Sequence, residues 1–225
     1  MEGCIKHMKV SKLFEDGHTI AWTYLTELEW PWDALSQINT YIEELGAALD
    51  TSEYEVRPDN VWIHKSATVA PSAYIGSSVI IGADAEIRHS AFIRKNAIIG
   101  NNTVVGNSTE LKNVILFDCV QVPHFNYVGD SILGYKAHLG AGVITSNVKN
   151  DHTLVKVTLG AERVETGLKK FGAILGDYVE VGCNSVLNPG TVVGPNTDIY
   201  PLSMVRGFVP AGCIYKTQGE IVKKT

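Results

Sequence analysis

The sequence has only four cysteines and no long apolar run, and both features limit what the protein can be. Cys4, Cys119, Cys183 and Cys213 are scattered without a CxxC pair, so neither a zinc knuckle nor a disulfide framework is indicated. No apolar stretch approaches the roughly 20 residues of a membrane-spanning helix, and the N-terminus lacks the apolar core of a signal peptide. We therefore expect a cytoplasmic protein without a membrane partner.

Positive charge is also scarce. The 19 Lys and Arg residues are outnumbered by 24 Asp and Glu, which leaves a formal net charge of −5. This balance argues against a nucleic-acid partner. The composition is otherwise ordinary, and 225 residues can form one large domain or one domain with an appendage.

The dominant feature that is present is a repeat of six residues. Aliphatic or aromatic residues recur at this interval in the first half of the chain: Ile63, Val69, Ile75, Ile81, Ile87, Ile93, Ile99, Val105, Leu111 and Phe117. The same phase returns later: Leu133, Leu139, Thr145, then Leu175, Val181, Leu187, Val193, Ile199 and Val205. A small residue precedes most of them by two positions, and glycine follows several.

A period of six fits neither an α-helix nor an ordinary strand. It predicts a coil with three short flat sides and about 18 residues per turn, in which each side directs one aliphatic side chain inward. Glycine or another small residue would allow the bend at each corner. The motifs IG, VG and LG resemble the hexapeptide-repeat family, and this resemblance implies a mainly β fold, the left-handed parallel β-helix.

The repeat has limits and two interruptions, which predict the organisation of the chain. Residues 59–216 are expected to form the coil, and 217–225 a C-terminal tail. The phase slips between Phe117 and Leu133, and the repeat stops between Asn147 and Gly172, so 148–172 is predicted to leave the coil as a loop or ribbon. Such interruptions are where a site is expected.

Residues 1–58 carry no hexapeptide signal and are predicted to be helical. The segment 33–49 has an apolar face at helical spacing, with Asp33 as the candidate N-cap. We expect a helical cap over the open end of the coil, whose strand edges would otherwise be unpaired. A role in substrate binding is the alternative.

Spacing predicts one anion site on the coil. Arg94 and Lys112 both follow an inward aliphatic residue and are 18 residues apart, so they are expected to stack about 5 Å apart on adjacent turns. Two such cations suit a phosphate, although acidic neighbours or solvent could equally satisfy them. Glu110 lies on the same side as Lys112. His124 falls inside the phase slip, 18 residues before Gly142, whose small size would leave the imidazole room.

Two longer segments resemble a specific enzyme family. The motif PHFNYVGDSILG followed by LGAGVITSN is similar to the glucosamine-1-phosphate acetyltransferase domain of the bifunctional enzymes that make UDP-N-acetylglucosamine. The segment 156–194 is especially similar to the archaeal sugar-phosphate nucleotidylyltransferase and acetyltransferase form. The resemblance covers roughly residues 60 to 210. It implies acetyl-CoA as co-substrate, no metal, and a homotrimer with sites between neighbouring coils.

The resemblance also implies residue roles. His124 matches the catalytic histidine and Glu110 its acidic support, whereas Arg94 and Lys112 match the pair that binds the sugar phosphate. The remaining matches are to sugar-contacting and cofactor-binding positions: Tyr127, His138, Asn147 and Lys156 for the sugar phosphate, and Ala141 and Gly142 for the acyl-CoA arm.

Two positions depart from the family pattern, and both are substrate-facing. His138 stands where Asn is usual, and Thr153 stands where a lysine follows the Asn147 segment, although Lys156 is near. The glycine-rich nucleotide loop of the uridyltransferase half has no counterpart here, so nucleotidyl transfer is not expected.

The sequence thus predicts transfer of an acetyl group from acetyl-CoA to the amine of an amino-sugar 1-phosphate, with His124 as general base. The alternative is a non-catalytic module that binds a sugar phosphate or sugar nucleotide. A γ-type carbonic anhydrase would use the same coil, but it needs closely paired histidines on zinc, which His89, His124, His138 and His152 do not provide.

Overall fold

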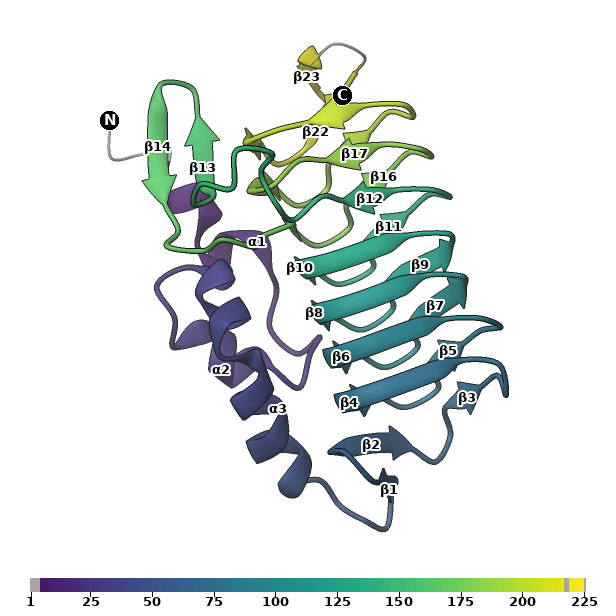
Figure 1. Cartoon of the computed structure of the whole chain (residues 1–225). Coiled ribbons are helices and arrows are strands. Elements are labelled where there is room, and N and C mark those ends of the chain that lie inside the picture. The colour runs from purple at the N-terminus through teal and green to yellow at the C-terminus, as the bar shows by residue number, and fades with distance from the viewer. Residues whose placement is uncertain (1–4, 217–218, 225) are drawn as a thin grey trace.

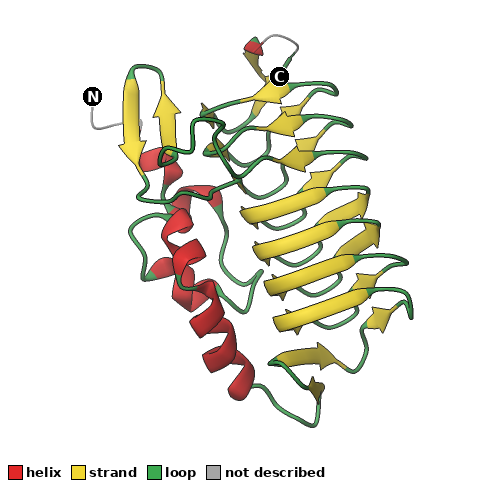
Figure 2. Ribbon diagram, in the orientation of Figure 1, coloured by secondary structure: helices red, strands yellow, loops and turns green. Residues whose placement is uncertain are grey.

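The structure is a computed structural model that describes residues 5–216 and 219–224. Most of it is a left-handed parallel β-helix, with a group of short helices beside it (Figures 1 and 2). The period of six predicted the coil, and the resemblance implied its hand. Parallel strands of successive turns pair in register, as Ile75 does with Ile93 and Val69 with Ile87.

The strands belong to three sheets in the described part of the chain. The largest contains β1 (Tyr54–Arg57), β2 (Val61–His64), β4 (Tyr74–Ile81), β6 (Phe92–Ile99), β8 (Glu110–Leu116), β10 (Tyr127–Leu133), β12 (Ile144–Thr145), β15 (Ala173–Leu175), β17 (Val186–Leu187), β18 (Thr191–Val193), β20 (Met204–Val205) and β21 (Phe208–Val209). The second contains β3 (Thr68–Val69), β5 (Glu86–Ile87), β7 (Val104–Asn107), β9 (Gln121–His124), β11 (His138–Leu139), β16 (Glu180–Val181), β19 (Asp198–Ile199), β22 (Cys213–Tyr215) and β23 (Ile221–Lys223). A separate hairpin pairs β13 (Lys156–Leu159) with β14 (Glu162–Glu165).

The corners of the coil are made differently from the prediction. Several bends have a polar non-glycine residue in the left-handed region: Ser78 (φ 54°), Asn96 (54°), Asn113 (59°) and Asp130 (48°). Asn and Asp tolerate this conformation better than most residues. Glycines that follow the aliphatics serve close approach instead, because a Cβ on Gly106 would lie 1.6 Å from the Pro123 carbonyl oxygen of the next turn.

The helical segment consists of η1 (Ile5–Met8), α1 (Val10–Leu13), α2 (Trp22–Thr26), η2 (Pro31–Ser36) and α3 (Ile38–Ala47). The single helix predicted for 33–49 is therefore divided, and Asp33 lies inside η2, where its carboxylate accepts a hydrogen bond from the Trp30 N–H (3.0 Å). Within the described residues, no helix is both long and apolar enough to span a membrane.

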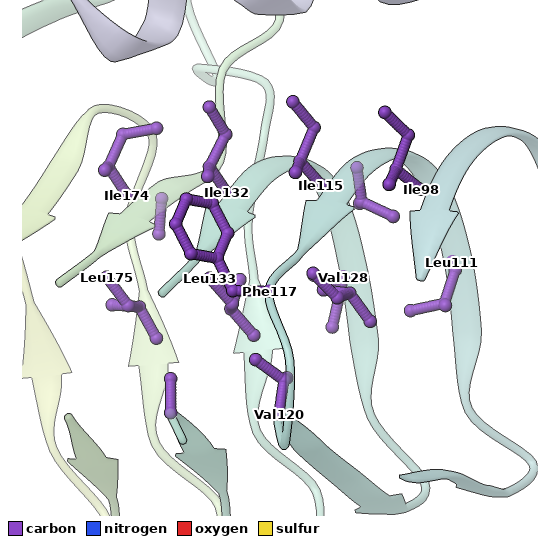
Figure 3. Packing of buried hydrophobic residues seen from close by; sticks show 14 of the residues in the cluster. Ile98, Leu111, Ile115, Phe117, Val120, Val128, Ile132, Leu133, Ile174 and Leu175 are labelled. Atoms are coloured by element: carbon purple, nitrogen blue, oxygen red, sulfur yellow. The ribbon is translucent and has the colours of Figure 1, made fainter. Parts of the chain in front are cut away.

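These helices lie along the side of the coil rather than over its end, which corrects the predicted position of the cap (Figure 1). α3 packs on β4, β6 and β8, and η2 packs on β10. The reason is a row of outward aliphatic side chains that are fully buried beneath the helices: Ile80, Ile98, Ile115, Ile132 and Ile174. Figure 3 shows four of them in one row toward the N-terminal ribbon.

At each end of the stack, one sheet is finished by a reversal of the chain. β1 pairs antiparallel with β2 at the first turn, and β23 pairs antiparallel with β22 at the last. The described part of the predicted tail therefore extends a sheet. The predicted insertion forms the β13–β14 hairpin, whose base is anchored by the buried side chains of Val155, Val157 and Phe171.

A buried carboxylate joins the N-terminal segment to the coil. Asp177 is 1% exposed and accepts hydrogen bonds from the backbone N–H groups of Glu15 (2.6 Å) and Tyr135 (2.7 Å). Burial raises the pKa of Asp177 from 3.8 to about 6, against the opposing effect of those two donors.

This raised pKa predicts a pH-dependent stability. Between pH 6 and 4 the folded chain binds a proton at Asp177 that the unfolded chain does not. This proton adds to the free energy of unfolding at low pH, and the added stability is lost as the pH rises through about 6. The free energy of unfolding should change by at most about 1.4 kcal/mol per pH unit from this one group. Urea unfolding between pH 4 and 7 should show wild type gaining stability relative to Asp177→Asn as pH falls. A constant difference would contradict the assignment.

Candidate active site

The register of the coil changes at the predicted phosphate site. Ile93 pairs with Leu111, eighteen residues on, but Lys95 pairs with Lys112, seventeen residues on, so Arg94 is the extra residue of a β-bulge. The next turns keep seventeen residues, as the pairing of Glu110 with Tyr127 shows. The prediction that Arg94 and Lys112 stack directly is therefore wrong.

The shorter turn also changes which residue points inward near the phase slip. Leu116, not Phe117, pairs with Ile99 and with Leu133 in the adjacent turns. Phe117 instead lies 4.7 Å from the ring of Phe14 in the N-terminal segment. The slip was predicted between Phe117 and Leu133, but the first residue is lost before this interval, between Leu111 and Leu116. A second residue is lost within it, between Val128 and Leu133.

Lys112 belongs to a buried ion pair. Its amino group contacts both carboxylate oxygens of Asp130 (2.8 and 3.0 Å), and the two side chains are only 14% and 5% exposed. Asp130 also accepts hydrogen bonds from the side-chain amides of Asn113 and Asn147. Lys112 thus holds a carboxylate in place, and the sequence analysis missed that carboxylate.

Arg94, Glu110, Tyr127 and Asn147 form a polar cluster on the outer face of β6, β8 and β10. Arg94 donates to Glu110 (2.9 Å), Glu110 lies beside Tyr127 in register, and Asn147 donates to the Tyr127 hydroxyl (3.2 Å). Burial, followed by the charges of Asp130 and Glu110, raises the pKa of Tyr127. The Tyr127 phenol therefore remains protonated at neutral pH and can donate a hydrogen bond.

His124 lies at the adjoining corner, at the end of β9, and Tyr127 begins β10 just beyond it. The corner is fixed by Phe125, whose φ is 50°, and by buried Asn126, which accepts from the His124 N–H and donates to the Gly140 carbonyl (2.8 Å). The imidazole is exposed and makes no hydrogen bond with another described residue. Glu110 pairs with Arg94 and not with His124, which differs from the role that the resemblance implied.

The GAG segment lies on the turn after His124, but this turn has seventeen residues, as the pairing of Gln121 with His138 shows, so Gly142 lies one position beyond the predicted vertical neighbour. Gly142 donates its N–H to the His124 carbonyl (3.1 Å). Its φ is +74°, and a Cβ there would lie 2.2 Å from the Asn184 side-chain oxygen, so only glycine fits without displacement. The Ala141 N–H makes no hydrogen bond within the described chain and is available to a ligand.

Two predicted substrate residues lie away from this cluster in the single chain. His138 pairs with Gln121 at the start of β9, roughly 10 Å along the strand from His124, and bonds to Glu180 (2.7 Å). Lys156 lies on the hairpin and pairs with Glu165 (2.6 Å). Thr153 is bonded to Asp151 within the loop before the hairpin.

The cysteines and the metal-binding residue types give no sign of another centre. Cys119, Cys183 and Cys213 are free thiols, and Cys4 lies outside the described residues. No group of three or more His, Cys, Asp and Glu residues in the described ranges is arranged to hold a metal ion.

Comparison with known protein families gives one match. The family of the GMPPB C-terminal domain matches residues 81–206, which is more than half of the sequence. The chain belongs to this family. The GMPPB C-terminal domain match includes the corner of His124, the polar cluster and the hairpin.

Relatives confirm the resemblance to the bifunctional sugar-phosphate enzymes. The bifunctional protein GlmU of Methanococcus maripaludis is 35% identical over 221 residues, which are 96% of this chain and 54% of the relative. The bifunctional sugar-1-phosphate nucleotidylyltransferase/acetyltransferase of Sulfurisphaera tokodaii is 34% identical over 107 residues, 48% of this chain and 27% of the relative. The chain therefore spans about half or less of their length. The longer match exceeds the predicted range of 60 to 210 and includes most of the helical segment.

Among solved structures, AntD, an N-acyltransferase from Bacillus cereus in complex with dTDP and coenzyme A, is 16% identical. Its TM-score is 0.40, and the match covers 76% of this chain and 90% of that chain.

Proposed function

We propose that this protein is an acetyl-CoA-dependent N-acetyltransferase that acts on the amine of an amino-sugar 1-phosphate resembling glucosamine-1-phosphate. The observation that carries this proposal is the exposed imidazole of His124, which has no partner among the described residues and adjoins the polar cluster at one corner. The names of the two bifunctional relatives, one of which includes an acetyltransferase, support it.

His124 is the general base of the proposed step. The amine nitrogen attacks the thioester carbonyl, a C–N bond forms, and the C–S bond to coenzyme A breaks. The nitrogen gains positive charge as it attacks, so its proton passes to the imidazole and then to the leaving sulfur. Only an imidazole that is not already committed to a neighbouring group can accept this proton.

The carbonyl oxygen becomes negative during this step and needs hydrogen-bond donors. The free N–H of Ala141, one turn after His124, is one donor, and the protonated Tyr127 hydroxyl is another. Gly142 leaves space for the acyl-CoA arm beside them.

We assign the phosphate of the acceptor to Arg94, the exposed cation of the cluster, whose planar guanidinium suits a phosphate. Lys112 acts indirectly, because it fixes Asp130 and thereby Asn147. Glu110 orients Arg94. His138 and Lys156 reach an acceptor bound at this cluster only if a neighbouring coil contributes them.

A homotrimer is part of this proposal and is supported by one face of the coil. Residues of successive turns stack there in register as a column that is apolar at both ends: Tyr74, Phe92, Glu110, Tyr127, Ile144, Val186 and Met204. Tyr74, Phe92, Val186 and Met204 are exposed in the single chain. A subunit packed on this column would cover them and enclose the polar cluster between two coils.

The test is release of the coenzyme A thiol from acetyl-CoA with glucosamine-1-phosphate and related amino-sugar phosphates. N-acetylglucosamine-1-phosphate, which has no free amine, is the matched control acceptor. We expect saturable release with at least one amino sugar and none with the control. Absence of amine-dependent release across the series would reject acetyl transfer.

Non-catalytic binding of a sugar phosphate is a second candidate, and one observation favours it. Glu110 is engaged by Arg94, so no described side chain orients the imidazole of His124. This function predicts saturable binding of the amino-sugar phosphate without thiol release in the same experiment.

A further inference from the structure

A cavity of about 570 Å³ lies between the β13–β14 hairpin and the later turns of the coil, apart from the corner of His124. Figure 1 shows the hairpin beside these turns. The residues that line the cavity come from three segments: the coil, the hairpin and the loop that begins at Val148.

The coil supplies one wall as a regular column. Thr145 pairs with Leu187 and Leu187 with Val205, so the residues that follow them stack on three successive turns about 4.8 Å apart. These residues are Ser146, Asn188 and Arg206, and all three line the cavity.

The hairpin wall is seated against the coil by two glycines in the left-handed region. A Cβ on Gly190 (φ +80°) would lie 2.8 Å from the carbonyl oxygen of Lys156, and one on Gly207 (φ +74°) would lie 2.5 Å from that of Thr158. Since β13 approaches the coil this closely at two points, the cavity has fixed walls.

The cavity is strongly basic although the chain is acidic overall. Lys149, Lys156, Arg163 and Arg206 line it, and Asp151 is the one carboxylate among its described lining residues. Lys149 pairs with Asp151 (3.2 Å), and Lys156 pairs with a carboxylate outside the lining. The guanidinium groups of Arg163 and Arg206 are the two cations of the lining that remain without a carboxylate partner among the described residues.

The arginines of the chain divide into two groups. Three of the five are ion-paired to a carboxylate at 2.7–2.9 Å: Arg57, Arg88 and Arg94. Arg163 and Arg206 have no hydrogen bond or ion pair with any other described residue, and both line the cavity from different walls. Two cations that line one cavity without acidic partners repel each other, and an anion bound between them would relieve this repulsion.

We propose that this cavity binds a diphosphate group, with Arg163 and Arg206 as its phosphate ligands. Each guanidinium offers two parallel donors that match phosphate oxygens. None of the described lining residues is aromatic, so the cavity recognises the phosphates rather than stacking on a base. A diphosphate occurs both in nucleotide-activated sugars and in coenzyme A. Arg163 and Arg206 are not among the residues assigned to acetyl transfer, and binding of pyrophosphate here requires no turnover.

Calorimetric titration of the full chain with inorganic pyrophosphate at low salt tests the site. We expect one pyrophosphate per chain, and Arg163→Gln and Arg206→Gln should each weaken binding by about tenfold or more. Arg206→Lys keeps the charge but not the fork and should weaken it less. Arg88→Gln removes the same charge from an exposed pair elsewhere and should bind as wild type.

Three outcomes would overturn the proposal: no saturable pyrophosphate binding, unchanged binding by both cavity variants, or equal weakening by Arg88→Gln. Competition with UDP and with coenzyme A then distinguishes the two sources of diphosphate. Because pyrophosphate binding and thiol release are measured separately, failure of this site and failure of acetyl transfer give different results.

Discussion

Replacement of His124 by alanine should lower the rate of acetyl-CoA thiol release by about 10²–10⁴-fold, the usual contribution of general base catalysis. The imidazole is exposed and makes no hydrogen bond to other described residues, so its removal leaves the corner built by Asn126 and Gly142 intact. The substrate affinity should change much less than the turnover rate. The measurement is steady-state thiol release with the amino-sugar phosphate found active.

His64→Ala is the matched control, because His64 is a partly exposed histidine of the first turn, bonded to Ser66 and remote from the cluster. It should retain wild-type rates. Free imidazole in the buffer should restore part of the activity of His124→Ala, and it should leave the rate of His64→Ala unchanged. Equal rates for wild type and His124→Ala would remove His124 from the mechanism.

Lys112→Met should destabilise the fold by about 3–5 kcal/mol, because it leaves the carboxylate of Asp130 buried without its cation. Asp130 is 5% exposed, and solvent cannot replace the lost partner. Asn147 should also lose its fixed position, because it is held by a hydrogen bond to the same carboxylate. Urea unfolding gives the free energy of unfolding.

Two further variants make this test specific. Arg88→Met breaks an ion pair whose members are 38% and 46% exposed, and it should cost no more than about 1 kcal/mol. Adding Asp130→Asn to Lys112→Met removes the unpaired charge and should recover much of the loss. A Lys112→Met effect as small as that of Arg88→Met would show that the pair is not buried in solution.

The coil could be predicted from the sequence because its period follows from the positions of individual aliphatic residues, such as Ile81, Ile87 and Ile93. Vertical neighbours could not, because they depend on the length of each turn. A turn that is one residue shorter leaves most of the hexads intact but moves vertical neighbours by one position, so Lys112 faces Lys95 and not Arg94. Turns of eighteen residues return later, as the pairing of Glu180 with Asp198 shows. The resemblance assigned the site residues without using turn length, and those assignments stay predictions.

Two other features had signals that the period of six concealed. The doubled aliphatics in VII, AII and VIL predict an outer row that must be covered, and they identify the side where the helices pack. Asp130 stands in the motif YVGDS, but its partner could be found only with the true register. The hairpin wall against Gly190 and Gly207 is a contact between distant segments and left no local pattern.

The chain reversals at β1 and β23 also bear on how these molecules behave in crowded solution. A coil that stopped at a bare parallel rung would offer a template on which the next molecule could continue, and the product would be a fibre. Here one sheet at each end finishes with a strand that runs in the opposite direction, β1 or β23, and these strands carry charged side chains, among them Glu55, Arg57 and Lys223. Growth along the axis is thereby opposed in one of the two sheets at each end.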